Sequence, residues 1–182
     1  KKSKSRSASK RILNKIMRLA IISDSHDNVP NLEKFLDWIA KEKINFILHC
    51  GDLAAPAMLT KVLAPKFSGE IHMVHGNVGD PELLEIVAKN FPNVTVHGMV
   101  GEIEVGGKKI AFTHFPEKAL ELAKKGTFDL VFYGHTHKPW EETTGKTRLV
   151  NPGTLAGMFY KATFAVYDTK TDKLELKILE RI

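Results

Sequence analysis

Residues 18–28 have the sequence RLAIISDSHDN, in which an apolar, strand-like run ends in Asp24, Ser25 and His26. Four further apolar runs end in the same way, close to a side chain that can bind a metal ion. These runs and their endings are 46–50 with Asp52, 71–75 with Asn77, 110–113 with His114, and 130–133 with His135 and His137. In an α/β sheet, ligands bind outside the carboxyl ends of the strands. We therefore expect seven oxygen- and nitrogen-bearing side chains in one zone.

The spacing of these residues suits shared ligands. Residues i and i+2 of an extended chain point the same way, so Asp24 with His26, and His135 with His137, can each direct two donors to one place. The carboxylate of Asp52 has two oxygens and can bridge two cations. Taken singly, each motif also has a structural explanation, such as a turn cap or a core histidine. The combination favours a metal site.

The mixture of donors narrows the choice of metal and of chemistry. Histidine, aspartate and asparagine together suit Mn²⁺, Fe²⁺, Zn²⁺, Ni²⁺ or Co²⁺, whereas Ca²⁺ sites use oxygen ligands only. The single cysteine, Cys50, argues against a structural zinc site built on thiolates. Two ions about 3.5–4 Å apart lower the pKa of a shared water and clamp the attacking and leaving oxygens of an in-line displacement. The donor set therefore predicts a hydrolytic metalloenzyme that acts on phosphoesters.

The positive charge of the chain is concentrated at its start. The formal net charge is +6, from 27 basic and 21 acidic residues. Residues 1–16 hold seven of the basic residues and no acidic one, so 20 basic and 21 acidic residues remain from Met17 onward, a balance of −1. We interpret residues 1–16 as a basic N-terminal extension, either a leader or a disordered segment before a natural start at Met17. An electrostatic arm for an anionic partner is the alternative, and nucleic acid is not an expected partner of the remainder.

Composition also bears on location. No run of the chain approaches the roughly 20 apolar residues of a membrane-spanning helix, and the basic tail lacks the apolar stretch of a secretory signal. Cys50 has no second cysteine for an internal disulfide, which suits a reducing compartment. We therefore expect a cytoplasmic protein without membrane contacts, in which Cys50 is a small buried apolar residue rather than a nucleophile.

The first half of the chain alternates strand and helix patterns. The strand-like runs cover 18–23, 45–50 and 70–75, and the helical patterns begin after Asn28, near Pro56 and at Pro81. This β-α-β-α-β-α order favours a parallel sheet with right-handed crossovers.

The second half is richer in short β-type runs. Gly106-Gly107 predicts a hairpin between 100–105 and 108–113, and a helix near 117–125 precedes a strand over 129–133. Further strand pairs cover 141–150 and 162–179. Because no linker separates the halves, we expect residues 17–182 to form one α/β domain with two packed sheets and flanking helices.

The ordered motifs resemble those of a known family. The succession D-x-H, G-D, G-N, H and G-H-x-H resembles the calcineurin-like metallophosphoesterases. Residues 23–28 (SDSHDN), 49–52 (HCGD) and 151–154 (NPGT) are similar to the YfcE-type phosphodiesterase subfamily. The resemblance covers nearly all of 17–182. It implies a four-layer αββα sandwich of two mixed β-sheets flanked by helices.

The resemblance also implies roles for the donors. One ion would be held by Asp24, His26 and His137, the other by Asn77, His114 and His135, and both by Asp52. Members of the family typically use two divalent ions, with Mn²⁺ preferred, and Ni²⁺, Fe²⁺, Co²⁺ and Zn²⁺ are alternatives. A metal-bridging hydroxide would attack phosphorus, with Asp52, Asn77 and His114 as catalytic residues. The implied substrate is a small phosphodiester, and the subfamily is known mainly for cleaving artificial ones.

One motif departs from the family. The wider family has Gly-Asn-His followed by an acid where residues 76–80 here read GNVGD, and that histidine acts on the substrate phosphate or the leaving group. Val78 cannot donate a proton, and general acid catalysis is typically worth ~10²–10⁴-fold. We therefore predict activity on diesters with good leaving groups and little activity on alkyl monoesters. His75, two residues before Asn77, is a candidate substitute acid, whereas Asp80 is expected to cap the next helix.

Several other residues are expected to have structural roles. Asp27 and Asn28 are interpreted as helix caps, and 151–154 as a fixed turn that positions backbone near the His135/His137 pair. Trp140 is expected to pack rather than to wall the substrate pocket. His72 and His97 lie in strand segments without a partner motif.

A non-catalytic, protein-binding scaffold on the same fold is the alternative function. The retromer subunit of this fold is similar in length and works mainly through protein contacts. That subunit departs from the ligand set, whereas every metal position is filled here, which favours the enzyme. Association between copies of the chain, as a homo-oligomer, is left open.

Overall fold

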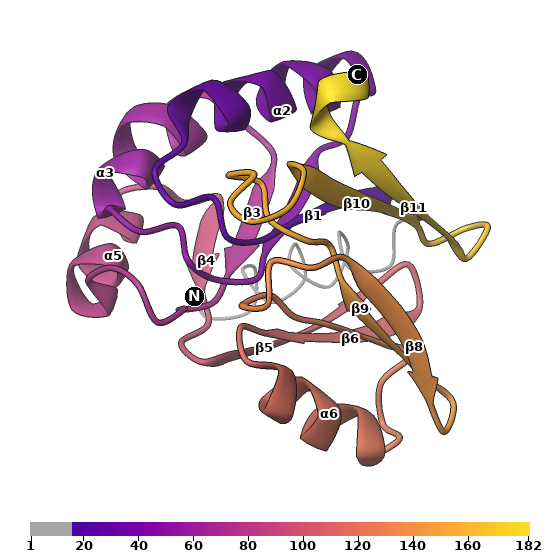
Figure 1. The fold of residues 1–182 in the computed structure, drawn as a ribbon. Coiled ribbons are helices and arrows are strands. Elements are labelled where there is room, and N and C mark those ends of the chain that lie inside the picture. Colours follow the sequence, from indigo (N-terminus) through magenta and orange to yellow (C-terminus); the bar gives the residue numbers. More distant parts are fainter. Residues whose placement is uncertain (1–15) are drawn as a thin grey trace, which may run out of the picture.

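The computed structural model describes residues 16–182, in which two β-sheets face each other (Figure 1). The predicted extension over 1–16 lies outside these residues, apart from Ile16. The first sheet contains, from edge to edge, β11 (Lys173–Ile178), β10 (Thr163–Asp168), β1 (Arg18–Ile22), β2 (Phe46–His49), β3 (Glu70–Met73) and β4 (Val94–Val96). β1 to β4 run parallel, and β10 pairs antiparallel with both β1 and β11. Ile22 pairs with His49 and His49 with Met73, so the carboxyl ends of β1, β2 and β3 lie at one edge.

The second sheet is also mixed. It contains, in spatial order, β5 (Val100–Val105), β6 (Lys108–Thr113), β7 (Leu130–Phe132), β9 (Thr147–Asn151) and β8 (Trp140–Thr144). The predicted hairpin at Gly106-Gly107 joins β5 to β6, and β6, β7 and β9 run parallel. Phe112 pairs with Phe132, so β6 and β7 also end at one edge.

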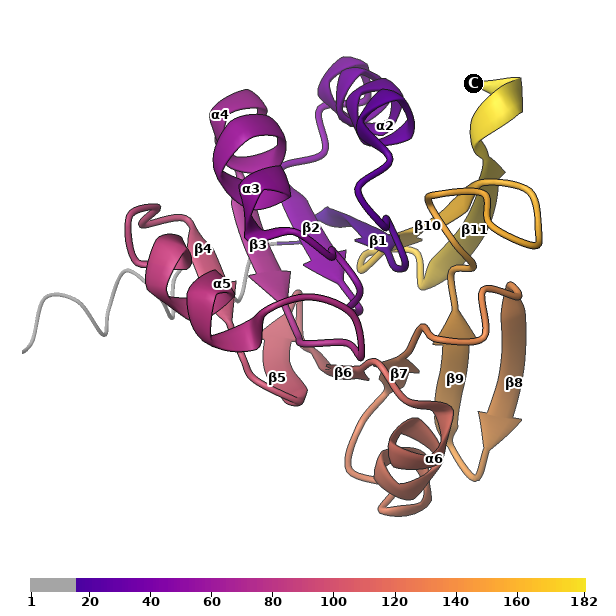
Figure 2. The same ribbon diagram turned by 60° about the vertical axis from the view of Figure 1, so that its left-hand side comes forward.

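Helices cover the outer faces of both sheets, as Figures 1 and 2 show. On the first sheet lie α2 (Val29–Lys41), α3 (Pro56–Met58), α4 (Ala64–Lys66) and α5 (Pro81–Ala88), whereas α6 (Pro116–Lys124) covers the second sheet. The chain ends in a 3₁₀ turn, η2 (Leu179–Arg181). No helix within residues 16–182 is long and apolar enough to cross a membrane.

Three buried apolar clusters account for this layering. Ile22, Phe35 and Leu59 belong to the cluster between the first sheet and its helices. Phe46 and Phe132 belong to the cluster between the two sheets. Residues of α6, β6, β7 and β9 form the third cluster, outside the second sheet. Because strand side chains alternate between faces, each sheet contributes to two clusters, and the result is the αββα sandwich expected from the sequence.

The helix ends follow the predicted capping chemistry in part. The Asn28 side chain accepts a hydrogen bond from the backbone N–H of Asn31 at the start of α2, and Asp80 does the same for Leu83 in α5. The prediction that Asp27 caps α2 is wrong. Its carboxylate accepts instead from the N–H of Ala55, and so fixes the segment that follows β2.

The helix predicted near Pro56 to Leu63 differs from a regular α-helix. Between α3 and α4, residues Leu59–Leu63 form a π-helical turn, η1, and the N–H of Ala64 bonds to the carbonyl of Leu59. The next residue, Pro65, has no N–H to donate to the carbonyl four residues back. The regular i to i−4 pattern cannot run through this point, and a wider turn accommodates the chain.

The structure agrees with the predicted role of Cys50. Cys50 is fully buried, and burial raises the pKa of its thiol well above the usual value. A thiol held neutral in this way is a poor nucleophile, which agrees with its interpretation as a small apolar residue.

His72 and His97, for which the sequence shows no partner motif, contact each other. His72 Nδ1 lies 2.8 Å from His97 Nε2, and the ring of His72 stacks on Phe46 with centroids 4.9 Å apart. Burial lowers the pKa of each imidazole to about 4. A neutral pair, in which one ring donates and the other accepts, therefore joins β3 to the end of β4.

The pKa values of this pair make the stability of the fold depend on pH. Each ordinary value is 6.5 and each folded value about 4, so the unfolded chain binds more protons between these pH values. The contribution of the pair is complete above pH 6.5 and is lost as the pH falls through about 4. We expect the double variant His72→Gln/His97→Gln, which cannot titrate, to lose about 3–6 kcal/mol less free energy of unfolding than wild type between neutral pH and about pH 4, because each buried histidine contributes about 3 kcal/mol and solvent screens part of the contribution of the less buried His97. Urea denaturation measures this, and equal losses would contradict the assignment.

Candidate metal centre

The seven predicted donors lie together where strands of both sheets end. Each lies within five residues after the end of a strand: Asp24 and His26 follow β1, Asp52 follows β2, Asn77 follows β3, His114 follows β6, and His135 and His137 follow β7. The register that aligns these strand ends therefore also aligns the donors. The structure brings all seven into one continuous cluster.

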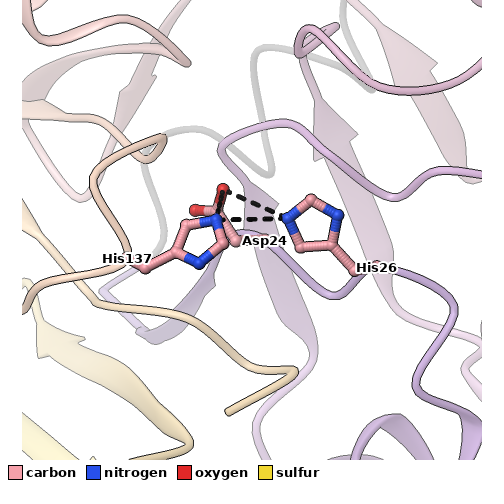
Figure 3. A group of neighbouring side chains, drawn as sticks. All are labelled: Asp24, His26 and His137. Carbon is pink, nitrogen blue, oxygen red and sulfur yellow. Dashed lines mark hydrogen bonds and ion pairs between the residues drawn. The ribbon is translucent and has the colours of Figure 1, made fainter. Parts of the chain in front are cut away.

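One group of donors consists of Asp24, His26 and His137 (Figure 3). His137 Nε2 lies 3.1 Å from Asp24 Oδ1, and His26 Nε2 lies 3.7 Å from the same oxygen. The two Nε2 atoms are 3.2 Å apart. Figure 3 shows a nitrogen of each imidazole directed at the carboxylate, so three potential ligands from two distant segments converge.

A second group consists of Asn77, His114 and His135. Asn77 Oδ1 lies 2.9 Å from both His114 Nε2 and His135 Nδ1. These two nitrogens are 3.3 Å apart. Three different strand ends supply this group, so its assembly depends on the approach of the two sheets.

Asp52 lies between the two groups. Its Oδ2 is 3.6 Å from His26 Nε2 and 3.4 Å from His114 Nε2. Its Oδ1 accepts a hydrogen bond of 2.9 Å from the N–H of Val78, which fixes the plane of the carboxylate. One carboxylate oxygen thus faces a histidine from each group.

The hydrogen bonds of the cluster test whether it suits a cation. His114 Nδ1 donates to the carbonyl of Cys50 at 2.9 Å, and His137 Nδ1 donates to that of Met158 at 3.4 Å. In the neutral form of each ring, Nε2 then keeps a lone pair directed into the cluster, as in metal-bound histidines. Asp24 Oδ1 is buried and has no hydrogen-bond partner, yet faces His137 Nε2. Two acceptors in contact need a cation or a proton between them, so these donors fit a divalent ion.

The backbone is strained where the donors lie. Five of the seven have a positive φ: Asp24 (52°), His26 (38°), Asp52 (56°), His135 (69°) and His137 (59°). Few residues other than glycine adopt this region, and it persists only where the surroundings impose it. Hydrogen bonds from the N–H of Asp24 to the carbonyl of Gly51, and from the N–H of His135 to Asp24 Oδ2, hold two of these positions. Such concentrated strain is typical of functional sites.

Two glycines of the predicted motifs are required by close packing. A Cβ atom at Gly76 would overlap Asp52 Oδ1, and one at Gly134 would overlap Ser23 Oγ. These positions let the backbone approach the carboxylates closely. The glycine before Asn77 and the glycine before His135 thus serve the donors of neighbouring strands.

The charges within the cluster keep Asp52 ionised. Burial acts to raise the pKa of Asp52, but the hydrogen bond and charge of His114 outweigh it, and the pKa lies below the usual value. The pKa of His26 is raised, mainly by the Asp24 carboxylate 3.7 Å away and against the effect of burial. Burial also opposes the shift at His114, where the hydrogen bond and charge of Asp52 raise the pKa. Asp52 is therefore a carboxylate, the form that binds metals.

Buried residues outside the donor set hold the loops in place. His49, which begins the HCGD motif but received no role from the sequence, is fully buried, and its Nε2 lies 3.1 Å from the hydroxyl of Ser25, the residue between Asp24 and His26. Burial lowers the pKa of His49 to about 4, so its ring is neutral. The sequence offered one signal for this supporting role: His49 ends β2, and Ser25 lies between two predicted donors after the neighbouring strand.

The predicted turn at 151–154 supports the loop that carries His135 and His137. The side-chain amide of Asn151 donates to the carbonyl of Gly134 at 2.9 Å and to the hydroxyl of Thr136 at 3.0 Å. The hydroxyl of Thr154 donates to the carbonyl of Asp24 at 3.0 Å. The turn therefore ties the loop after β7 to the loop after β1, which agrees with its predicted role.

His75 is the one predicted site residue that the structure directs elsewhere. Its Nε2 lies 2.9 Å from a carboxylate oxygen of Glu85 on α5. Val78, in contrast, is 44% exposed and lies beside Asp52, to which its N–H donates. The position next to the cluster is thus occupied by Val78, whose side chain has no proton to donate. His75, the candidate substitute acid, pairs instead with Glu85 on α5.

The fold and the donor cluster together define the metallophosphoesterase class of hydrolases. Residues 17–172 match the family model described as the calcineurin-like phosphoesterase superfamily domain. The chain belongs to this family, as the sequence motifs predicted.

Individual relatives agree with this assignment. Phosphodiesterase MJ0936 of Methanocaldococcus jannaschii is 27% identical over 168 residues, which are 90% of this chain and 100% of the relative. A solved archaeal phosphodiesterase matches with a TM-score of 0.81 at 25% identity, over 89% of this chain and 99% of its own. The phosphoesterase YfcE of E. coli matches at a TM-score of 0.64 and 19% identity, over 90% of this chain and 100% of its own. Vps29 of Entamoeba histolytica, solved with zinc, also matches at 0.64 and 19%, over 88% and 97%. These last two show a shared fold only.

Proposed function

We propose that this protein is a dinuclear metal-dependent phosphodiesterase that hydrolyses small phosphodiesters. The observation that carries the proposal is the position of Asp52, whose Oδ2 lies within 3.6 Å of a histidine nitrogen from each donor group. A carboxylate that faces two groups of ligands is suited to a pair of adjacent cations. The relative named as a phosphodiesterase supports the choice of a diester substrate.

The charge of the donor set supports a singly charged substrate. Asp24 and Asp52 are its two carboxylates, and the other five donors are an amide and four imidazoles. Two divalent ions bound by these residues would leave a net charge of about +2. That charge is balanced by one diester anion and one hydroxide, whereas a monoester dianion and the same hydroxide together exceed it.

The proposed roles of the residues follow from their positions. Asp52 lies between the two donor groups, His114 contacts it, and Asn77 contacts His114, so these three residues would face the attacked phosphate. When bound, the ions would supply a water of lowered pKa as the nucleophile and neutralise the charge that develops on phosphate oxygens. Val78 supplies no proton to the leaving group, so substrates whose leaving group needs none are favoured.

The metal and the location are part of the proposal. We propose Mn²⁺, with Ni²⁺, Fe²⁺, Co²⁺ and Zn²⁺ as ions that the same mixed nitrogen and oxygen donors accept. We propose the cytoplasm as the location, because the single cysteine is buried and unsuited to disulfide formation.

A protein-binding scaffold is the second candidate, because Vps29 structures share the fold. The complete donor set and its strained backbone favour catalysis over this role. A scaffold needs neither a bridging carboxylate nor five donors at positive φ.

The test is hydrolysis of bis(p-nitrophenyl) phosphate by chelator-treated protein, with and without added Mn²⁺. We expect no turnover without metal, recovery that saturates at two ions per chain, and little hydrolysis of an alkyl monoester. His114→Ala should abolish the recovery, whereas the matched variant His97→Ala, a histidine outside the cluster, should not. Mn²⁺ binding without any turnover would favour the scaffold, and turnover in His114→Ala would contradict the proposed site.

A further inference from the structure

Exposed aromatic side chains gather on one side of the metal centre. Of the aromatic residues within 16–182, three are largely exposed: Trp140 (49%), Phe159 (86%) and Tyr160 (47%). Trp140 begins β8, three residues after His137, and the other two belong to the segment between β9 and β10. Figure 2 shows this segment as the gold loop beside β10, close to the end of β9. Within residues 16–182, the exposed aromatic side chains therefore belong to the segments that follow His137 and β9.

Phe159 is held outward at the rim of the cluster. Its ring centroid lies 5.5 Å from that of His137, and the preceding carbonyl, of Met158, accepts the hydrogen bond from His137 Nδ1. Phe159 has a φ of +63°, in a region that a bulky residue adopts only where its surroundings impose it. Exposing a large apolar ring also forgoes the free energy of its burial. Both costs apply at a position that adjoins a predicted metal ligand.

A hollow with aromatic walls lies beside the same loop. Its volume is about 310 Å³, and it is lined by Tyr133, Thr136, Lys138, Trp140 and Tyr160. This volume falls in the range of small-molecule sites. Lys138 Nζ lies 5.4 Å from the centroid of the Trp140 ring, so the hollow combines flat apolar faces with one cation.

The chemistry of a phosphodiester indicates what these rings could bind. The phosphate of a diester carries two substituents, one that leaves and one that is retained. If the phosphate binds at the predicted metal ligands, one substituent can reach the exposed aromatic side chains beside His137. Aromatic side chains stack on flat rings such as nucleobases, with about 1–3 kcal/mol per base. Saturated alkyl substituents offer no such face.

We propose that the aromatic rim of Trp140, Phe159 and Tyr160, with the hollow beside Lys138, binds a planar aromatic ring on the retained substituent of the substrate. The substrate class is thus a phosphodiester of nucleoside type. This inference rests on the proposed phosphodiesterase function and deepens it.

The test compares two substrates that share a leaving group. Thymidine 5′-(p-nitrophenyl phosphate) retains a base-bearing substituent, and methyl p-nitrophenyl phosphate retains a methyl group, so the ratio of their kcat/KM values isolates the retained group. We expect the ratio to favour the nucleoside ester in wild type. It should fall about tenfold in Phe159→Ala, mainly through KM, because one stacked base is worth about 1–3 kcal/mol. Phe159→Tyr, which keeps a flat ring, should preserve the ratio.

Ile86→Ala is the control, because Ile86 is also an exposed apolar residue and lies on α5, away from the aromatic rim. It should leave both the ratio and the rates unchanged. If both esters are hydrolysed, but neither Phe159→Ala nor Tyr160→Ala changes the ratio of their kcat/KM values, the inference about the aromatic rim is wrong. The proposed phosphodiesterase function would then still stand. Absence of Mn²⁺-dependent hydrolysis of either ester would overturn the proposed function, and the inference with it.

Discussion

Replacing Asp52 by alanine is expected to reduce phosphodiester hydrolysis by more than about 10²-fold, which is the upper end of the cost of losing a residue that merely supports a metal ligand. Asp52 Oδ2 faces His26 in one donor group and His114 in the other. Its loss would remove the carboxylate that both proposed ions share and leave three of the seven donors for each. The measurement is kcat/KM for bis(p-nitrophenyl) phosphate at saturating Mn²⁺, together with the number of ions bound per chain.

Two further variants make the result interpretable. Asp52→Asn keeps an oxygen that can accept from the N–H of Val78, so the fold is retained while the bridging charge is lost. It should be nearly as inactive as Asp52→Ala. Asp172→Ala removes an exposed carboxylate that pairs with Lys108 and is not one of the seven donors. This control variant should retain wild-type activity. Full activity in Asp52→Asn would show that the carboxylate does not bridge the ions.

Replacing Val78 by histidine is expected to create activity on alkyl phosphomonoesters, with a gain of about 10²-fold, the lower end of what a general acid contributes. Val78 is exposed at the edge of the cluster, and its N–H is bonded to Asp52. A histidine side chain at this position could reach a leaving-group oxygen and give it a proton. The gain should grow as the leaving group becomes more basic, because poorer leaving groups depend more on protonation.

The measurement is a series of esters of graded leaving-group pKa, with Val78→Leu as the control for side-chain volume. Val78→Leu should behave as wild type across the series. An equal rate change for every leaving group in Val78→His would mean that the new imidazole acts through binding or packing, and the explanation of the Val78 departure would fail.

Much of the fold was predictable because its patterns are local. The apolar run at 18–22, the cap at Asn28 and the turn at Gly106-Gly107 each determine their own element through side-chain period or backbone freedom. The αββα arrangement was implied by the family resemblance, and the comparisons confirm it. The turn at η1 was missed because a π-helix has no distinct apolar period, and only Pro65 hinted at an interruption.

The candidate site was predictable as a set of residues but not as an arrangement. Strand ends placed the seven donors in one zone, yet the approach of the two sheets decides that Asn77 contacts His135. The pairing of His75 with Glu85, and of His72 with His97, also depends on packing between segments that no sequence motif links. The exposure of Phe159 follows from a loop held by His137 through Met158, a contact between residues 21 apart.

The claim on which this account depends is that these donors hold two adjacent divalent ions. The most direct test is a crystal of the protein grown with Mn²⁺, in which anomalous scattering locates manganese. We predict two peaks about 3.5–4 Å apart. One should be ligated by Asp24, His26 and His137, and the other by Asn77, His114 and His135, with Asp52 bound to both. A single peak at full occupancy, or peaks that Asp52 does not touch, would contradict the account.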